Sequence, residues 1–112
     1  MKSDSDNYVL IFDLVKQIPI GKVTTYGIIA KLIGGKVSAR VVGYALNKAS
    51  LNQEIPAHRV VNRNGLLTGR HHFNPNTLMQ KLLEQEGIKI EKHQIVNFQE
   101  VLWNPLLDEN YL

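Results

Sequence analysis

The feature that most constrains the fold is a pair of short segments with helical apolar spacing, separated by Gly34-Gly35. Thr25 can cap a helix over residues 26–33, and Ser38 can cap another over residues 39–48, because such side chains accept hydrogen bonds from free first-turn amides. The two glycines supply the permissive backbone that ends the first helix. The pattern predicts a helix-turn-helix motif, although many helical hairpins share it.

Two further predicted helices flank this motif. Between Asp6 and Gln17 one helical face is apolar, and it consists of Tyr8, Ile11, Phe12, Leu14 and Val15. Another helix is expected from Asn74-Pro75, with a proline near its first turn, to Gly87. The residues of that helix expected to pack inward are Leu78, Leu82 and Leu83.

A small β element is predicted between these helices. The segment Ile55–Val61 carries a proline at its second position and β-branched residues on both sides of His58, which favours a stiff, extended, partly buried strand. Asn64-Gly65 then separates Val60-Val61 from Leu66-Leu67, which is the pattern of a β-hairpin. We therefore expect a wing beside the helix-turn-helix.

The C-terminal part has a weaker pattern. Residues 88–90 alternate like a strand, and a tail is expected to fold back on the domain through Phe98, Val101, Leu102, Trp103 and Leu106. Together the segments predict a mainly α fold with a small β wing, a winged helix-turn-helix arrangement that occurs in DNA-binding domains and that occupies residues 1–112 as a single domain.

Charge distribution bears on the partner. The chain has a net charge of only +3, but residues 36–72 contain six Lys and Arg side chains against one acid, Glu54, giving that segment +5. Clustered cations suit a phosphate-facing surface because DNA binding releases counterions. A solvated basic face is the alternative.

The chain contains no cysteine, which excludes disulfides, thiolate metal sites and cysteine catalysis. The adjacent His71 and His72 lack the spacing of metal ligands, so no metal or other cofactor is expected. No apolar run approaches the roughly 20 residues that span a bilayer. A cytoplasmic protein, nucleoid-associated if bacterial, is the expectation.

The sequence Ile-Pro-Ala-His-Arg-Val-Val at residues 55–61 resembles the Ile-Pro-Cys-His-Arg-Val-Val active-site segment of the O6-alkylguanine-DNA alkyltransferases. Thr-Tyr-Gly at residues 25–27 and Ala-Arg-Val-Val-Gly at residues 39–43 occur in the order of that family. Ala57 stands where the family has its acceptor cysteine. The chain therefore resembles the alkyltransferase-like proteins, which bind O6-alkylguanine without repairing it, although most of them carry tryptophan at this position.

The resemblance implies a DNA-binding set that also admits structural interpretations. Tyr26 is expected to press on the phosphate beside the target base, or else to be an amphipathic core tyrosine. Arg40 is expected to fill the gap left by an extruded nucleotide, or else to contact phosphate or solvent. Gly43 would allow close approach to the minor groove or tight helix packing. The implied DNA-binding residues are Tyr26, Ser38, Ala39, Arg40 and Gly43.

The resemblance also implies a lesion pocket with structural support behind it. Arg70 replaces the usual tyrosine and could stack on an extruded base. His58 and Glu86 would form a supporting pair rather than an acid-base pair, and Trp103 would pack near the pocket or simply anchor the tail. The implied pocket residues are Tyr26, Ala57, Val60, Thr68, Gly69 and Arg70, and the supporting residues are Asn47, His58, Arg59 and Glu86.

The expected function is damage recognition: a non-enzymatic monomer binds O6-alkylguanine in double-stranded DNA, flips the nucleotide, and flags it for nucleotide excision repair proteins or shields it. A winged-helix transcriptional regulator without lesion specificity is one alternative. A hydrolytic enzyme that uses His58 and Glu86 is another.

Overall fold

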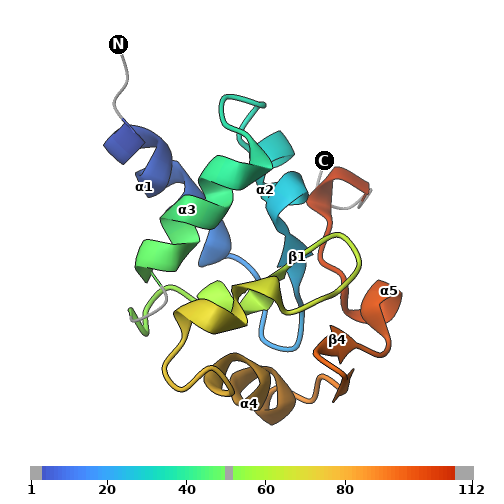
Figure 1. Ribbon diagram of the computed structural model, residues 1–112. Helices are drawn as coiled ribbons and strands as arrows, with labels where there is room; N and C mark the ends of the chain where they lie inside the picture. The colour runs from blue at the N-terminus through green and yellow to red at the C-terminus, as the bar shows by residue number, and fades with distance from the viewer. Residues whose placement is uncertain (1–3, 50–51, 108–112) are drawn as a thin grey trace.

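The computed structural model describes residues 4–49 and 52–107 of the chain. In Figure 1, α3 crosses in front of α1 and α2, while α4 lies at the opposite end of the molecule and the C-terminal segment runs beside β1. The helices, strands and 3-10 turns (η) are, in chain order, α1 (Asp4–Val15), β1 (Thr24–Thr25), α2 (Tyr26–Leu32), α3 (Ala39–Ala49), η1 (Ala57–Arg59), β2 (Val60–Val61), η2 (Thr68–His72), α4 (Leu78–Gln85), β3 (Ile90–Glu91), β4 (Gln94–Ile95), α5 (Phe98–Val101) and η3 (Pro105–Leu107).

The predicted helix-turn-helix is formed by α2 and α3. Thr25 Oγ1 accepts a hydrogen bond from the amide three residues later at 3.1 Å, and Ser38 Oγ does the same at 3.2 Å. Gly34 and Gly35 have φ values of +84° and +72°, in the left-handed region that glycine enters without a steric penalty. Both caps and the glycine turn are therefore confirmed.

The core joins the three N-terminal helices to the central segment. Val42, Ala45 and Leu46 on α3 and Ile11 and Val15 on α1 are buried in one apolar cluster. Burial of such stripes contributes most of the stability of short helices, whose intrinsic propensity is marginal in water. The apolar periodicity thus identified the inner faces of α1 and α3 correctly.

The central segment is only partly the buried strand that was predicted: Val60–Val61 form strand β2, but the residues before them do not. Ala57 N–H donates to Ile55 O at 2.7 Å and Arg59 N–H donates to Pro56 O at 3.0 Å, so residues 57–59 form a 3-10 turn. A strand would send adjacent side chains to opposite faces. The turn instead lets both His58 and Arg59 reach the same carboxylate, while the methyl group of Ala57 stays buried.

The predicted pairing of Val60-Val61 with Leu66-Leu67 is wrong. β2 pairs in parallel with β1, and Leu66 forms an isolated antiparallel bridge with Gln94. Both valines are buried, which a two-stranded surface hairpin could not achieve because its side chains alternate between core and solvent. Two consecutive β-branched residues therefore indicated a strand that is buried on both faces.

The turn that Asn64-Gly65 predicted is present. Asn62 N–H donates to Leu66 O at 3.1 Å, and the Asn62 side-chain oxygen accepts from the amides of Asn64 and Leu66. This turn and the β3–β4 hairpin form the wing. That hairpin was missed because its turn uses Lys92 and His93 at positive φ instead of glycine or asparagine.

Gly65 lies where any larger residue is expected to destabilise the fold. Its φ is +78°, and a Cβ added there would lie 3.0 Å from Phe98 Cγ of α5. We expect Gly65→Ala to lower the free energy of unfolding by about 2 kcal/mol, because the strained backbone and the overpacking add. Urea denaturation measures this. Gly34→Ala is the control, since its φ is also positive but no atom lies within 4 Å; equal losses would exclude the Phe98 contact as a cause.

The tail folds back as predicted. Val23 N–H donates to Val101 O at 3.0 Å and Trp103 N–H donates to Val23 O at 2.6 Å, so the tail extends the edge beside β1. Leu106 is 46% exposed, so its predicted inward packing is wrong. The start of α4 also differs from the prediction, since residues 74–77 form a turn before Leu78.

The described residues thus form a mainly helical winged helix-turn-helix fold. Among them, no helix has both the length and the apolar character needed to cross a membrane.

Candidate nucleic-acid interface

The outer face of α3 carries the predicted DNA contacts. Ser38, Ala39 and Arg40 are exposed at its N-terminal end, opposite the buried stripe of the same helix. Tyr44, one turn beyond Arg40, is 51% exposed. A guanidinium and a phenol four residues apart lie on the same side of a helix, so α3 presents a stacking and hydrogen-bonding surface. Tyr44 was missed, although its spacing from Arg40 could have identified it.

A cavity of about 430 Å³ adjoins this face. It lies where the N-terminal ends of α2 and α3 meet the turn of the wing, and Arg63 on that turn is exposed. The cavity lining combines main-chain groups, a phenol, an amide and a guanidinium, all suitable for a sugar-phosphate strand. The lining residues are Thr25, Tyr26, Gly27, Ala39, Asn62 and Arg63. Asn62 and Arg63 were missed as site residues.

Tyr26 connects the α3 face to η2. A Cβ added at Gly43 would lie 3.9 Å from the Tyr26 ring, and a Cβ added at Gly69 would lie 3.0 Å from its hydroxyl oxygen. Burial raises the pKa of Tyr26, and a hydrogen bond with the Thr68 side chain only partly opposes this. Tyr26 therefore stays a neutral phenol. A Cβ at Gly43 would make only ordinary contact with its ring, whereas a Cβ at Gly69 would crowd its hydroxyl group.

The predicted pocket residues do not share one cavity. Ala57 is 7% exposed and Val60 is 1% exposed, so the Val60 side chain belongs to the core and forms no open wall. Neither residue lines the cavity beside Tyr26. Arg70 lines a different cavity, of about 200 Å³, next to α4. The structure thus brings Tyr26, Thr68 and Gly69 together, whereas Arg70, on the same turn η2, lines the cavity next to α4.

Glu86 is the centre of a partly buried hydrogen-bond network that includes the two residues after Ala57. Its carboxylate accepts from His58 Nε2 at 2.6 Å, from Arg59 Nε and Nη2 at 3.0 Å, and from the Gly21 amide at 2.9 Å. Arg59 Nη1 also donates to Ile18 O at 3.0 Å. The network ties η1 to the end of α4 and to the loop before β1, and Arg59 contacts both of these neighbouring segments.

The network fixes the charge states of its members. Burial opposes ionisation of Glu86, but hydrogen bonds from Arg59, Gly21 and His58 outweigh it and hold the pKa of Glu86 below its ordinary value. Burial lowers the pKa of His58, the Arg59 charge lowers it further, and the interaction with Glu86 only partly opposes them. His58 is therefore neutral at pH 7, with Nε2–H directed at Glu86.

These two shifts predict acid sensitivity of the fold. When folding lowers the pKa of a group, that group stabilises the folded state at pH values above its ordinary pKa. This stabilisation is lost as the pH falls through the pKa that the group has in the folded state. We expect the free energy of unfolding to fall below pH 6.5 because of His58, and again below pH 4.5 because of Glu86. Urea denaturation between pH 8 and pH 4 tests this. His58→Gln should remove the first decrease, and an unchanged pH profile in that variant would contradict the assignment.

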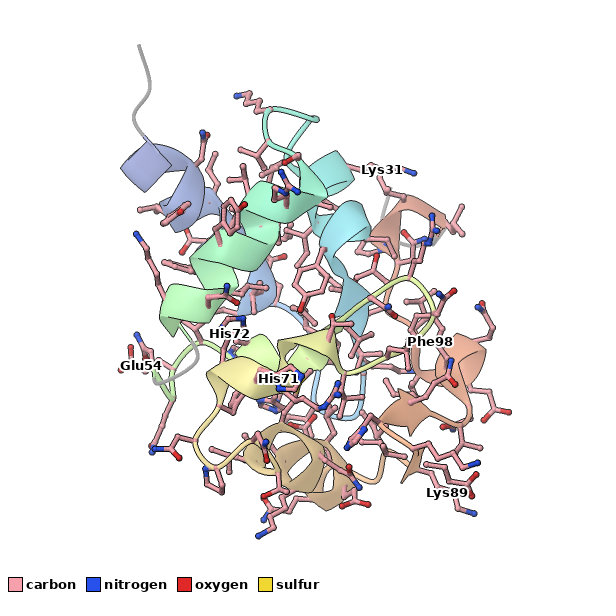
Figure 2. All side chains as sticks on the ribbon, viewed as in Figure 1. Lys31, Glu54, His71, His72, Lys89 and Phe98 are labelled. Carbon is pink, nitrogen blue, oxygen red and sulfur yellow. The ribbon has the colours of Figure 1, made fainter. Side chains whose placement is uncertain are left out.

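Asn47 and the two adjacent histidines lie on other elements than Glu86. Asn47 is exposed and lies within α3, two residues before its end. Figure 2 shows His72 on the side of η2 towards α3 and His71 on the side towards α4. Among the described residues there is no cluster of three or more possible metal ligands.

Comparison with known families gives one match over most of the chain. Residues 7–88 match the model of the 6-O-methylguanine DNA methyltransferase, DNA binding domain. Alkyltransferase-like protein 1 of Schizosaccharomyces pombe is 34% identical over 88% of this chain and 94% of its own length. A DNA base-flipping protein of Escherichia coli is 38% identical over 84% of this chain and 71% of its own length.

Comparison with solved structures finds proteins of the same kind. The crystal structure of S. pombe Atl1 in complex with damaged DNA containing O6-carboxymethylguanine aligns with a TM-score of 0.82 and 34% identity, over 94% of this chain and all of that one. The Mycobacterium tuberculosis OGT–DNA complex aligns with a TM-score of 0.65 and 33% identity, over 72% of this chain and 49% of that one.

Proposed function

Because this chain belongs to the family of the 6-O-methylguanine DNA methyltransferase DNA-binding domain, as an alkyltransferase-like member with Ala57 at the acceptor position, we propose that it binds O6-alkylguanine in duplex DNA without transferring the alkyl group. The observation that carries the proposal is the motif Ile-Pro-Ala-His-Arg-Val-Val on a fold that aligns with a relative bound to damaged DNA. The chain carries the residues that the resemblance assigns to DNA recognition and lacks the nucleophile.

Binding begins at α3. Arg40 lies at the exposed first turn of this helix, next to the cavity that Tyr26 and Ala39 line. We propose that α3 enters the minor groove, that Tyr26 presses on the phosphate beside the target guanine, and that Arg40 fills the gap in the stack. Extrusion costs a few kcal/mol, and less for a damaged pair, so these contacts and burial of the alkyl group must offset it.

The extruded base is held near Ala57, Thr68 and Gly69. Ala57 is buried, so the base reaches it only after neighbouring side chains move. The alanine methyl group cannot accept an alkyl group, and the chain offers no thiolate elsewhere. His58 and Glu86 then support the pocket without activating a nucleophile. The long-lived complex marks the lesion for nucleotide excision repair proteins or shields it.

The test is equilibrium binding to duplexes that differ only in guanine or O6-methylguanine, at two stated salt concentrations, with the recovered DNA weighed by mass spectrometry. We expect tighter binding to the lesion, with the methyl group still in place. Equal affinity would reject lesion recognition and favour a winged-helix regulator. Loss of the methyl group with turnover would instead support hydrolysis by His58 and Glu86.

A further inference from the structure

Tyr44 is a residue of α3 to which the proposed function gives no role, although 51% of it is exposed. The exposed stripe of this helix, on the side away from the core, also contains Arg40, Asn47 and Lys48. Lys48 is directed towards α1, since its Nζ lies 5.3 Å from the centre of the Tyr8 ring. Of the long side chains on this stripe, Arg40 and Tyr44 are therefore left to contact a ligand.

The spacing places Tyr44 close to the site of base extrusion. Tyr44 lies about 6 Å along the helix axis from Arg40, because each of the four residues between them adds about 1.5 Å. Residues four apart also share one face of a helix. Successive base pairs are about 3.4 Å apart. When Arg40 fills the gap left by the extruded nucleotide, Tyr44 is thus within about two base pairs of that gap.

The surface of α3 beside these two side chains is low. Ala39 and Gly43, which precede Arg40 and Tyr44 in the chain, carry a methyl group and no side chain. A helix with its side chains is about 10 Å across, whereas the minor groove is about 6 Å wide. The helix body therefore stays at the mouth of the groove, and only long side chains reach its floor.

A phenol suits the floor of the minor groove. Its flat ring packs against apolar surface, and its hydroxyl donates to the purine N3 and pyrimidine O2 acceptors at the edges of the base pairs. A G·C pair adds the N2 amino group of guanine, which is itself a donor and occupies the centre of the groove floor. The hydroxyl of Tyr44 therefore fits better beside a pair that lacks this amino group.

We propose that Tyr44 contacts the minor-groove edge of a base pair near the lesion, so that affinity for the lesion depends on that pair. Pairs without the N2 amino group of guanine are favoured. This inference rests on the proposed function, since it takes Arg40 to lie in the base stack. A tyrosine that contacted only phosphate would leave the affinity independent of base identity.

The test uses O6-methylguanine duplexes in which one guanine at a time, within two pairs of the lesion, is replaced by hypoxanthine, which lacks only the N2 amino group. We expect the replacement at one position to strengthen binding by a factor about threefold larger in the wild type than in Tyr44→Phe. A pair with hypoxanthine is also easier to open, but this effect is common to all variants. Tyr8→Phe removes the same hydroxyl group on α1 and should respond like the wild type.

Each duplex is also measured with guanine in place of O6-methylguanine. Equal responses of the wild type and Tyr44→Phe at every position, with the preference for the lesion intact, would overturn the role of Tyr44 alone. An equal loss of response in Tyr8→Phe would overturn it as well. A wild type that does not prefer the lesion would reject the proposed function and this inference with it.

Discussion

Replacing Arg40 by alanine is expected to weaken binding to an O6-methylguanine duplex by about 1–3 kcal/mol, roughly 5- to 150-fold. The side chain is exposed at the first turn of α3, beside the cavity that contains Tyr26. Its loss would leave the gap in the base stack unfilled and remove a positive charge near phosphate. Fluorescence anisotropy with labelled duplexes, at fixed salt concentration, measures the change.

Two further variants separate stacking from charge. Arg40→Lys keeps the charge but cannot stack, so it should recover only the salt-dependent part of the affinity. Lys89→Ala removes a cation near β3, far from α3 in Figure 2, and should leave binding nearly unchanged. Full recovery by lysine would show that Arg40 contacts phosphate only, and equal losses at positions 40 and 89 would show that only net charge matters.

Replacing Glu86 by glutamine is expected to cost about 3 kcal/mol of folding free energy. The carboxylate accepts from His58, Arg59 and Gly21, and its side chain is only 11% exposed. Glutamine has nearly the same shape but no charge, so Arg59 would stay buried without its counterion. Urea denaturation at pH 7 gives the change in unfolding free energy.

Glu84→Gln provides a matched control on the same helix. Glu84 is exposed, and its carboxylate interacts with Gln80 at 3.4 Å, so its loss should change stability by less than about 0.5 kcal/mol. Similar effects at positions 84 and 86 would contradict a structural role for the buried network. If Glu86→Gln folds and still distinguishes damaged from undamaged duplex, the network supports the fold more than the pocket.

Local sequence was sufficient for the helix-turn-helix. The caps at Thr25 and Ser38 and the turn at Gly34-Gly35 depend on contacts within about four residues, so composition and spacing revealed them. The motif around Ala57 likewise identified the family and the missing acceptor. Local reasoning failed where the chain pairs with distant partners: β2 joined β1 instead of residues 66–67.

For the candidate site, too, local sequence predicted some features and missed those that depend on distant parts of the chain. The resemblance named His58, Arg59 and Glu86, but no local pattern showed that the Gly21 amide, 65 residues from Glu86, completes the network. Nor could spacing show that Tyr26 and Arg70 line different cavities, since that depends on how η2 packs between α3 and α4.

By itself, then, the sequence determined the helix-turn-helix with its caps at Thr25 and Ser38, the apolar faces of the helices, the winged helix-turn-helix class and the absence of a thiol acceptor. Only the tertiary structure decided the strand pairing, the 3-10 turn at residues 57–59, the position of the tail and the partition of the pocket residues. The physical reason is how far apart in the chain the interacting groups lie. A cap or glycine turn is stable through neighbours in the chain, whereas a buried carboxylate or an internal strand is stable only among groups that folding brings together.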